Sequence, residues 1–342
     1  MSNSNVLSKR LNGKHIIFSD VQGNFNSLER FFKATQRMKK DGYICLGDIV
    51  NRGDDFDDNR CIEAVRNSES LCIKGNHEDK LLKNTEANKK ITFDNYYFVR
   101  SLQDKMRFDN CVLFHSSLRN PSERLISQES QREEADYVRT TYPSVNLAFL
   151  GHSHRRGMYS HKKDSLHDGG SKPIELDRND FYLINPGGIG LSFGLENTFA
   201  HFDFDKLKLK FFTLEEAEKM VETAEIVRRF EDWYMPALNK FSIGWFAAYV
   251  DRDFSYLYNH GNSNVLELAN TLRSFNPHRY RKLNEHKKDK YIKDFSLRLA
   301  ESTEKVRAVV SDFYETKSAI ESREEYLALK VQQWPDSSHL QT

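Results

Sequence analysis

The sequence predicts an α/β fold with a C-terminal all-helical extension, and three observations lead to this prediction. Residues 15–113 alternate short runs of β-branched or aromatic residues with helix-like segments, which implies crossover connections and a largely parallel sheet. Polar clusters stand where the strand-like runs end, as ligand sites do in open α/β sheets. After residue 213 the strand-like runs give way to helix-like segments.

The first third of the chain predicts a regular succession of strands and helices. The expected order is a strand near His15 to Ser19, a helix near Asn26 to Arg37, a strand at 43–46, a helix at 58–67 and a strand at 71–74. Two more helices, at about 77–86 and 93–106, are expected before the strand that leads into His115.

The middle of the chain is more varied. Residues 117–145 are polar and charged, which suits a helical surface excursion or a lid, and residues 156–178 are predicted to be a loop rich in Gly, Ser, Asp and Lys. The strand-like runs FAHFDFD and LKLKFFT then predict a hairpin.

A domain boundary is expected near residue 214. Thr213-Leu-Glu-Glu216 has the pattern of a helix capping box, and from there to about Gln333 the chain is helix-like. We therefore expect a first domain at residues 1–213 and a helical extension at 214–342.

Composition excludes several classes of protein. Across 342 residues, 51 basic and 50 acidic side chains give a net charge of +1, so no global field attracts nucleic acid or an anionic membrane. The four cysteines are not spaced as CxxC pairs, so a zinc site built from cysteines is not expected. A polar N-terminus and the absence of a long apolar run predict a cytoplasmic protein without a membrane partner.

Six short polar clusters follow strand-like runs in the first 190 residues. They are 20–24 after HIIFS, 47–48 after YICL, 75–78 after LCIK, His115 after CVLF, 151–154 after LAFL, and 185–188 after FYLI. Because the carboxyl ends of strands meet at one edge of a sheet, these distant clusters can converge in a single site.

The clusters carry carboxylate, amide and imidazole donors, namely Asp20, Asp48, Asn76, His115, His152 and His154. Such a set suits divalent Mn, Fe, Zn or Mg rather than a thiolate zinc site. Turn formation and helix capping would explain the Asp and Asn residues but not the recurring histidines. Two ions about 3.5–4 Å apart could activate water and clamp a phosphoryl group, so phosphate-ester hydrolysis is the expected chemistry.

At these clusters the sequence resembles the calcineurin-like metallophosphoesterase superfamily, whose signature runs DxH, GDxxxRG, GNH(D/E), an isolated His, and GHxH. The matching strings are SDVQGN, GDIVNRG, GNHE, the His of VLFHSS, and GHSH, over roughly residues 15–205. The resemblance implies a β-sandwich flanked by helices and a site with two divalent ions, manganese foremost, with Fe, Zn, Mg or Ni as alternatives.

Carried over residue by residue, the resemblance implies a role for each matched position. It places Asp20, Gln22, Asp48 and His154 around one metal, with Asp48 as the bridge, and Asn76, His115 and His152 around the other. His77 would be the general acid that protonates the leaving oxygen, Asn51 would orient His77, and Arg52 would contact the phosphate.

Two positions depart from the family pattern. Gln22 replaces a metal-binding His with a weaker oxygen donor, as in some diadenosine tetraphosphatase-like relatives. Asn51 stands where the protein-phosphatase branch has an Asp, which makes His77 less basic than in that branch. Asn185-Pro186-Gly187-Gly188 instead resembles the small bacterial and archaeal phosphodiesterases, in which such a segment closes the site.

The expected function is hydrolysis of a phosphomonoester or phosphodiester by a hydroxide that bridges two metals. The substrate could be a small molecule, a nucleotide or a phosphoprotein. Two alternatives stay open: a metal-poor scaffold that binds partners, and a nucleic-acid phosphatase or nuclease. The nucleic-acid alternative depends on residues 273–298, which contain nine basic and three acidic side chains. The helical extension could also mediate a homodimer.

Overall fold

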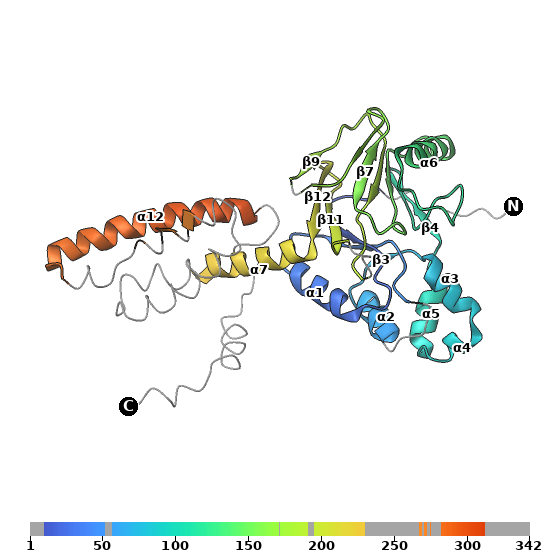
Figure 1. The fold of residues 1–342 in the computed structure, drawn as a ribbon, viewed down its shortest axis with the longest axis horizontal. Coiled ribbons are helices and arrows are strands. Elements are labelled where there is room, and N and C mark those ends of the chain that lie inside the picture. Colours follow the sequence, from blue (N-terminus) through green and yellow to red (C-terminus); the bar gives the residue numbers. More distant parts are fainter. Residues whose placement is uncertain are drawn as a thin grey trace. The chain divides into compact units, whose positions relative to one another are not determined.

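The computed structural model describes residues 10–51, 57–170, 172–190, 195–229, 267–268, 270–271, 274 and 282–311. The chain divides into two compact units, of which the first comprises residues 1–36 and 40–218 and the second residues 37–39 and 219–342. Both β-sheets belong to the first unit (Figure 1). The domain boundary expected after residue 213 stays a prediction.

The first sheet has six strands in the order β3-β2-β1-β11-β12-β9. Their bounds are β1 Lys14–Phe18, β2 Gly42–Cys45, β3 Leu71–Cys72, β9 Ile174–Glu175, β11 Thr198–Asp203 and β12 Lys208–Thr213. Strands β1, β2 and β3 run parallel, whereas β11 and β12 form the predicted hairpin and add antiparallel pairs.

The second sheet also has six strands, in the order β4-β5-β6-β10-β7-β8. Their bounds are β4 Lys105–Arg107, β5 Cys111–Phe114, β6 Leu147–Phe149, β7 Gly157–Ser160, β8 Ser165–His167 and β10 Tyr182–Asn185. Strands β5, β6 and β10 run parallel, and β4, β7 and β8 are antiparallel additions at the two sides.

The parallel pairing predicted from residues 15–113 is present in β1, β2 and β3, although each complete sheet also contains antiparallel strands. Residues 156–178 are not all loop: they contain β7, β8 and β9. These strands are only two to four residues long, so their own sequences give a weak strand signal, and they are recognised only by their pairing: β7 with β10, β8 with β7 and β9 with β12. The helix expected at 93–106 ends at Ser101, and β4 then pairs with β5.

The helices of the first unit follow the predicted order. Their bounds are α1 Phe25–Thr35, α2 Asp57–Asn67, α3 Asn76–Lys83, α4 Thr85–Asn88, α5 Phe93–Ser101 and α6 Gln128–Thr141. Asn24 caps α1, since its side chain accepts a hydrogen bond from the Ser27 N–H at 3.1 Å. Helix α6 is the helical excursion expected within residues 117–145.

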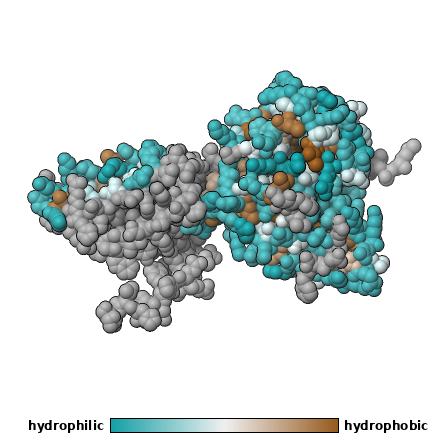
Figure 2. All heavy atoms as spheres, viewed as in Figure 1, coloured by the Kyte–Doolittle hydropathy of each residue, from teal (hydrophilic) through white to brown (hydrophobic). Residues whose placement is uncertain are grey.

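The hydrophobic core lies between the two sheets. Phe149 of β6 packs edge-on against Phe202 of β11, with ring centroids 5.2 Å apart, and both side chains are fully buried. Helix α1 covers the outer face of the first sheet through Phe31, and α6 covers the outer face of the second through Val138 (Figure 1). The fold is thus the expected β-sandwich flanked by helices, and its visible surface is mostly hydrophilic (Figure 2).

Two longer helices follow the sandwich, α7 at Leu214–Arg229 and α12 at Glu285–Ser311. The predicted cap of α7 is present, because the Glu216 N–H donates to Thr213 Oγ1 at 2.9 Å. Lys287, Lys290 and Lys293 of α12 are exposed, but binding of nucleic acid and dimer formation stay predictions. Among the described residues no helix has the length and apolar character needed to cross a membrane.

Candidate metal centre

The strand-end clusters of both sheets converge at one edge of the sandwich. Strands β1, β2 and β3 end just before Asp20, Asp48 and Asn76, and strands β5 and β6 end just before His115 and the segment 151–154. Since each sheet contains three neighbouring strands that run parallel, each sheet collects its polar residues at one edge. Side-chain contacts between Asp48 and His115 show that the two edges meet.

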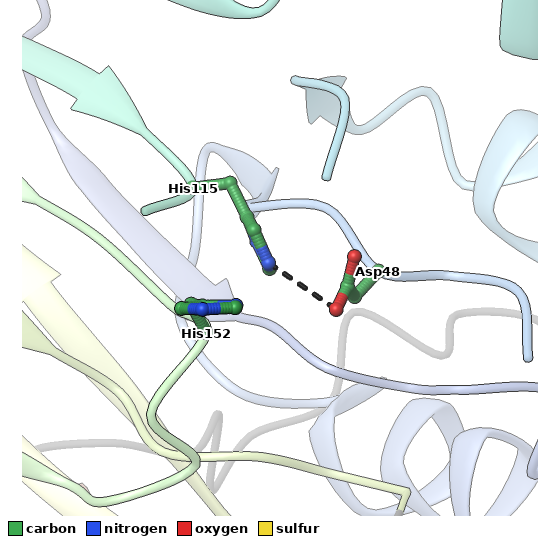
Figure 3. A group of neighbouring side chains, drawn as sticks. All are labelled: Asp48, His115 and His152. Carbon is green, nitrogen blue, oxygen red and sulfur yellow. Dashed lines mark ion pairs between the residues drawn. The ribbon is translucent and has the colours of Figure 1, made fainter. Parts of the chain in front are cut away.

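One group of donors consists of Asp48, His115 and His152 (Figure 3). One ligand atom from each of these three residues lies within 4.8 Å of the others. His115 Nε2 is 3.2 Å from Asp48 Oδ2 and also 3.2 Å from Asn76 Oδ1. His115 Nδ1 lies 2.7 Å from the Leu46 carbonyl oxygen, which makes Nδ1 the donor and leaves Nε2 directed at the site.

A second group, beside the first, consists of Asp20, Gln22 and His154. Gln22 Nε2 lies 3.0 Å from His154 Nε2, and His154 Nε2 lies 3.5 Å from Asp20 Oδ1. The two groups are linked because the His152 N–H donates to Asp20 Oδ2 at 3.0 Å. The structure thus brings all seven predicted ligands into one region, and their division between two ions stays a prediction.

The backbone of these loops adopts an uncommon conformation. Five of the seven predicted ligands have positive φ angles: Asp20 at 55°, Gln22 at 47°, Asp48 at 54°, His152 at 66° and His154 at 59°. A non-glycine residue in this region costs about 1–3 kcal/mol, and such residues collect at binding and catalytic sites. Asp and His tolerate it better than most residue types. The strain therefore marks the same loops as the donor atoms do.

Burial and mutual charge shift the pKa values of these groups. Burial raises the pKa of Asp20 to about 7, against the opposing effect of His115. Burial also raises the pKa of Asp48, but the charges and hydrogen bonds of His115 and His77 lower it more, so that it lies below the ordinary value. Burial lowers the pKa of His115, but the charge and hydrogen bond of Asp48, the charge of Asp20 and the hydrogen bond to Leu46 together raise it to about 10. Burial and His115 lower the pKa of His152 to about 4.

These residues fit a divalent cation. Asp20 Oδ1 is fully buried and makes no hydrogen bond to another described residue, so an acceptor is left over at the site. Asp20 and Asp48 are buried carboxylates whose nearby positive charge comes from a histidine. Oxygen and imidazole donors of this kind are the ligands that Mn²⁺, Fe²⁺ and Zn²⁺ take in proteins.

His77 lies at the rim of the first donor group. Its Nδ1 is 3.1 Å from the Val50 carbonyl oxygen, and its Nε2 is 3.9 Å from Asp48 Oδ2. The carbonyl of Val50 therefore orients the ring, a role that the resemblance assigned to the neighbouring amide of Asn51. The Asn51 backbone N–H instead donates to Asp58 Oδ1 at 2.9 Å. The predicted phosphate contact Arg52 lies outside the described residues.

Glu78 is a residue of this site to which the sequence patterns assigned no role. Its side chain is fully buried, and its carboxylate accepts hydrogen bonds from the loop that carries Asp48. Burial and the charge of Asp48 raise its pKa to about 7, although N–H groups of Val50 and Gly75 act in the opposite direction. The position of Glu78 in the GNHE string indicates that it lies near the site, but the string does not indicate which groups its carboxylate contacts.

Asn185, at the end of β10, connects the loops of the second sheet. Its Nδ2 donates to the Gly151 carbonyl oxygen at 2.7 Å and to Ser153 Oγ at 3.0 Å, and its Oδ1 accepts from the Gly187 N–H at 2.9 Å. The side chain is buried. Asn185 thus holds the segment on which His152 and His154 lie.

Comparisons with known proteins agree with this fold. The family model of calcineurin-like phosphoesterases matches residues 14–156. The protein MJ0912 of Methanocaldococcus jannaschii is 27% identical over 195 residues, which make up 51% of this chain and 75% of that protein.

Solved structures show the same likeness. A metallophosphoesterase from Sphaerobacter thermophilus aligns with a TM-score of 0.50 at 21% identity, over 63% of this chain and 94% of that one. A hypothetical protein from Pyrococcus horikoshii aligns with a TM-score of 0.43 at 17% identity, over 61% and 90% of the two chains.

Proposed function

We propose that the part of this chain that matches the calcineurin-like phosphoesterase model, residues 14–156, belongs to a metal-dependent phosphoester hydrolase that cleaves a phosphomonoester or phosphodiester with two divalent ions. The observation that carries this proposal is the position of Asp48. Its carboxylate lies 3.2 Å from His115 Nε2, and its negative charge acts on Asp20 as well, so it can serve both groups of donors.

The ligands divide between the two ions according to the observed contacts. Asp20, Gln22 and His154 would hold one ion, Asn76, His115 and His152 the other, and Asp48 would bridge them. Gln22 contributes a neutral oxygen, which favours manganese or iron over zinc on that side. When bound, the two ions would supply water activation and neutralisation of the phosphoryl charge.

The protein side chains would position the substrate and move the proton. His77 presents Nε2 to the site, because its Nδ1 is held by the Val50 carbonyl. The negative charge of Asp48, 3.9 Å from Nε2, favours the protonated imidazole that can give its proton to the leaving oxygen. From the resemblance, Arg52 would contact the phosphoryl oxygens.

The test begins with the wild-type chain, purified without chelators and analysed for bound metal. Hydrolysis of an aryl phosphate and of a bis-aryl phosphodiester is then measured with Mn²⁺, Fe²⁺, Zn²⁺ and Mg²⁺. We expect metal-dependent turnover that Asp48→Asn abolishes, whereas the exposed substitution Asp94→Asn leaves it unchanged. Turnover in Asp48→Asn equal to that of the wild type would refute the role of the bridge.

The role of His77 needs a separate comparison. His77→Gln should slow hydrolysis of alkyl phosphates, whose leaving groups need a proton, by about 100-fold or more. Aryl phosphates with acidic leaving groups should be affected much less. Equal losses for both substrate classes would show that His77 does not act as the general acid.

A further inference from the structure

The carboxylate of Glu78, on the first turn of α3, accepts four backbone hydrogen bonds. Oε1 accepts from the N–H groups of Ile49 at 2.7 Å and Val50 at 3.0 Å, and Oε2 accepts from those of Asp48 at 2.8 Å and Gly75 at 2.7 Å. The side chain has no exposed surface. Since each oxygen receives two donors, the carboxylate is fully occupied by the backbone and does not itself reach the site.

Three of the four donors belong to the turn after β2. This turn carries Asp48, whose φ angle of 54° is uncommon for a non-glycine residue and needs support from its surroundings. The turn and the start of α3 lie in direct contact, because a Cβ atom added to Gly75 would lie 2.2 Å from Asp48 Oδ1. Glu78 is therefore the group that joins the two segments at their closest approach.

The same turn also orients His77. The N–H of Val50 donates to Glu78, and the carbonyl of Val50 lies 3.1 Å from His77 Nδ1. In return, the backbone N–H of His77 donates to Asp48 Oδ1 at 2.9 Å. One buried carboxylate thus connects the proposed bridging ligand with the proposed general acid.

We propose that Glu78 is a positioning residue, which fixes the Asp48 carboxylate for metal binding and the His77 ring for proton transfer. This inference rests on the function proposed above. Glu78 would act on metal binding and proton transfer indirectly, because its four hydrogen bonds hold the backbone that carries Asp48 and orients His77.

Replacement by glutamine is an informative test, because it keeps the shape of the side chain. The oxygen of a carboxamide can accept one pair of N–H donors, but its NH₂ group would face the other pair and cannot accept from them. Groups that orient metal ligands from behind typically contribute about 10–100-fold to metal affinity. We therefore expect Glu78→Gln to weaken Mn²⁺ binding by about that factor and to lower kcat with little change in KM.

A matched control is available at Asp180. This residue is also buried and accepts hydrogen bonds from two backbone N–H groups, those of Lys162 at 2.8 Å and Phe181 at 2.7 Å. It lies at the start of β10, at the opposite end of that strand from Asn185. Asp180→Asn should lower the stability of the fold without changing Mn²⁺ affinity.

The experiment uses the full chain with three readouts. Calorimetric titration with Mn²⁺ gives metal affinity, steady-state kinetics separate kcat from KM, and ¹⁵N NMR of labelled histidine in metal-free protein reports which ring nitrogen of His77 carries the proton. In the neutral ring, observed at alkaline pH, wild-type His77 should carry its proton on Nδ1, and Glu78→Gln should lose this preference. Glu78→Asp, which keeps the charge but is one methylene shorter, serves if the glutamine variant does not fold.

The outcomes separate the two proposals. A wild-type chain that binds no Mn²⁺ and cleaves no ester would refute the proposed function, while the NMR comparison, which needs no metal, would still decide whether Glu78 orients His77. If a folded Glu78 variant keeps wild-type Mn²⁺ affinity and an unchanged His77 signal, and only loses stability as Asp180→Asn does, the positioning role is overturned.

Discussion

Replacement of Gly190 by alanine should displace the loop that carries Asp20. A Cβ atom added to Gly190 would lie 1.6 Å from the carbonyl oxygen of Val21, whereas ordinary contacts begin at 3.4 Å. The two backbone segments must therefore separate by about 1.8 Å, because neither clashing atom belongs to a side chain that could rotate away.

The size of the effect follows from the hydrogen bonds that this separation breaks. The Gly190 N–H donates to the Asp20 carbonyl at 2.9 Å, the Ile189 N–H to the Ser19 carbonyl at 3.0 Å, and Asn24 Nδ2 to the Gly190 carbonyl at 3.0 Å. Each bond contributes about 0.5–1.5 kcal/mol net. We expect the free energy of unfolding to fall by about 2–4 kcal/mol, together with metal affinity on the Asp20 side.

Urea denaturation and Mn²⁺ titration measure both effects. Gly170→Ala is the matched control, because the nearest atom that its Cβ would meet lies 4.0 Å away and the substitution should be nearly neutral. The reasoning would be refuted if Gly190→Ala unfolded within about 0.5 kcal/mol of the wild type and bound Mn²⁺ equally well.

Three further substitutions test the core and the site. Asn185→Ala removes three hydrogen bonds at the strand-end loops and should lower the free energy of unfolding, measured in urea, by about 2–3 kcal/mol. A loss under about 0.5 kcal/mol, the size typical of neutral surface substitutions, would contradict this expectation. Phe202→Ala empties a fully buried position between the sheets and should cost about 3–5 kcal/mol, whereas Phe93→Ala, at a side chain that is 73% exposed, should cost little in the same assay. Gln22→His places an imidazole beside His154 and should shift competitive metal binding from Mn²⁺ towards Zn²⁺, so an unchanged ratio of the two metals would disprove a ligand role for Gln22.

Much of the candidate site could be predicted because its signals are local. Each donor directly follows a strand-like run, and parallel strands deliver such residues to a common edge. Asp48, His115 and His152 accordingly lie close together, although they are spread over a hundred positions. It could not assign the orienting group of His77, because a backbone carbonyl has no sequence signature.

The fold was predicted less completely where pairing is distant in sequence. Strands β7, β8 and β9 are only two to four residues long, and they form because β7 pairs with β10, β8 pairs with β7 and β9 pairs with β12. Local propensity in such segments is weak, so only the partner strand decides the conformation. The same reason explains why strand β4, which pairs antiparallel with β5, was not foreseen.

The sequence by itself determined the class of chemistry, since carboxylate, amide and imidazole donors at six strand ends have few uses other than metal binding. The tertiary structure alone decided how those donors meet. In the tertiary structure two sheet edges meet, five of the predicted ligands have positive φ angles, and the carboxylate of Glu78 accepts a hydrogen bond from the backbone of Asp48. These features depend on hydrogen bonds from backbone N–H groups to carboxylates that lie about 30 to 130 residues away along the chain, and the sequence does not say which backbone groups a carboxylate will meet.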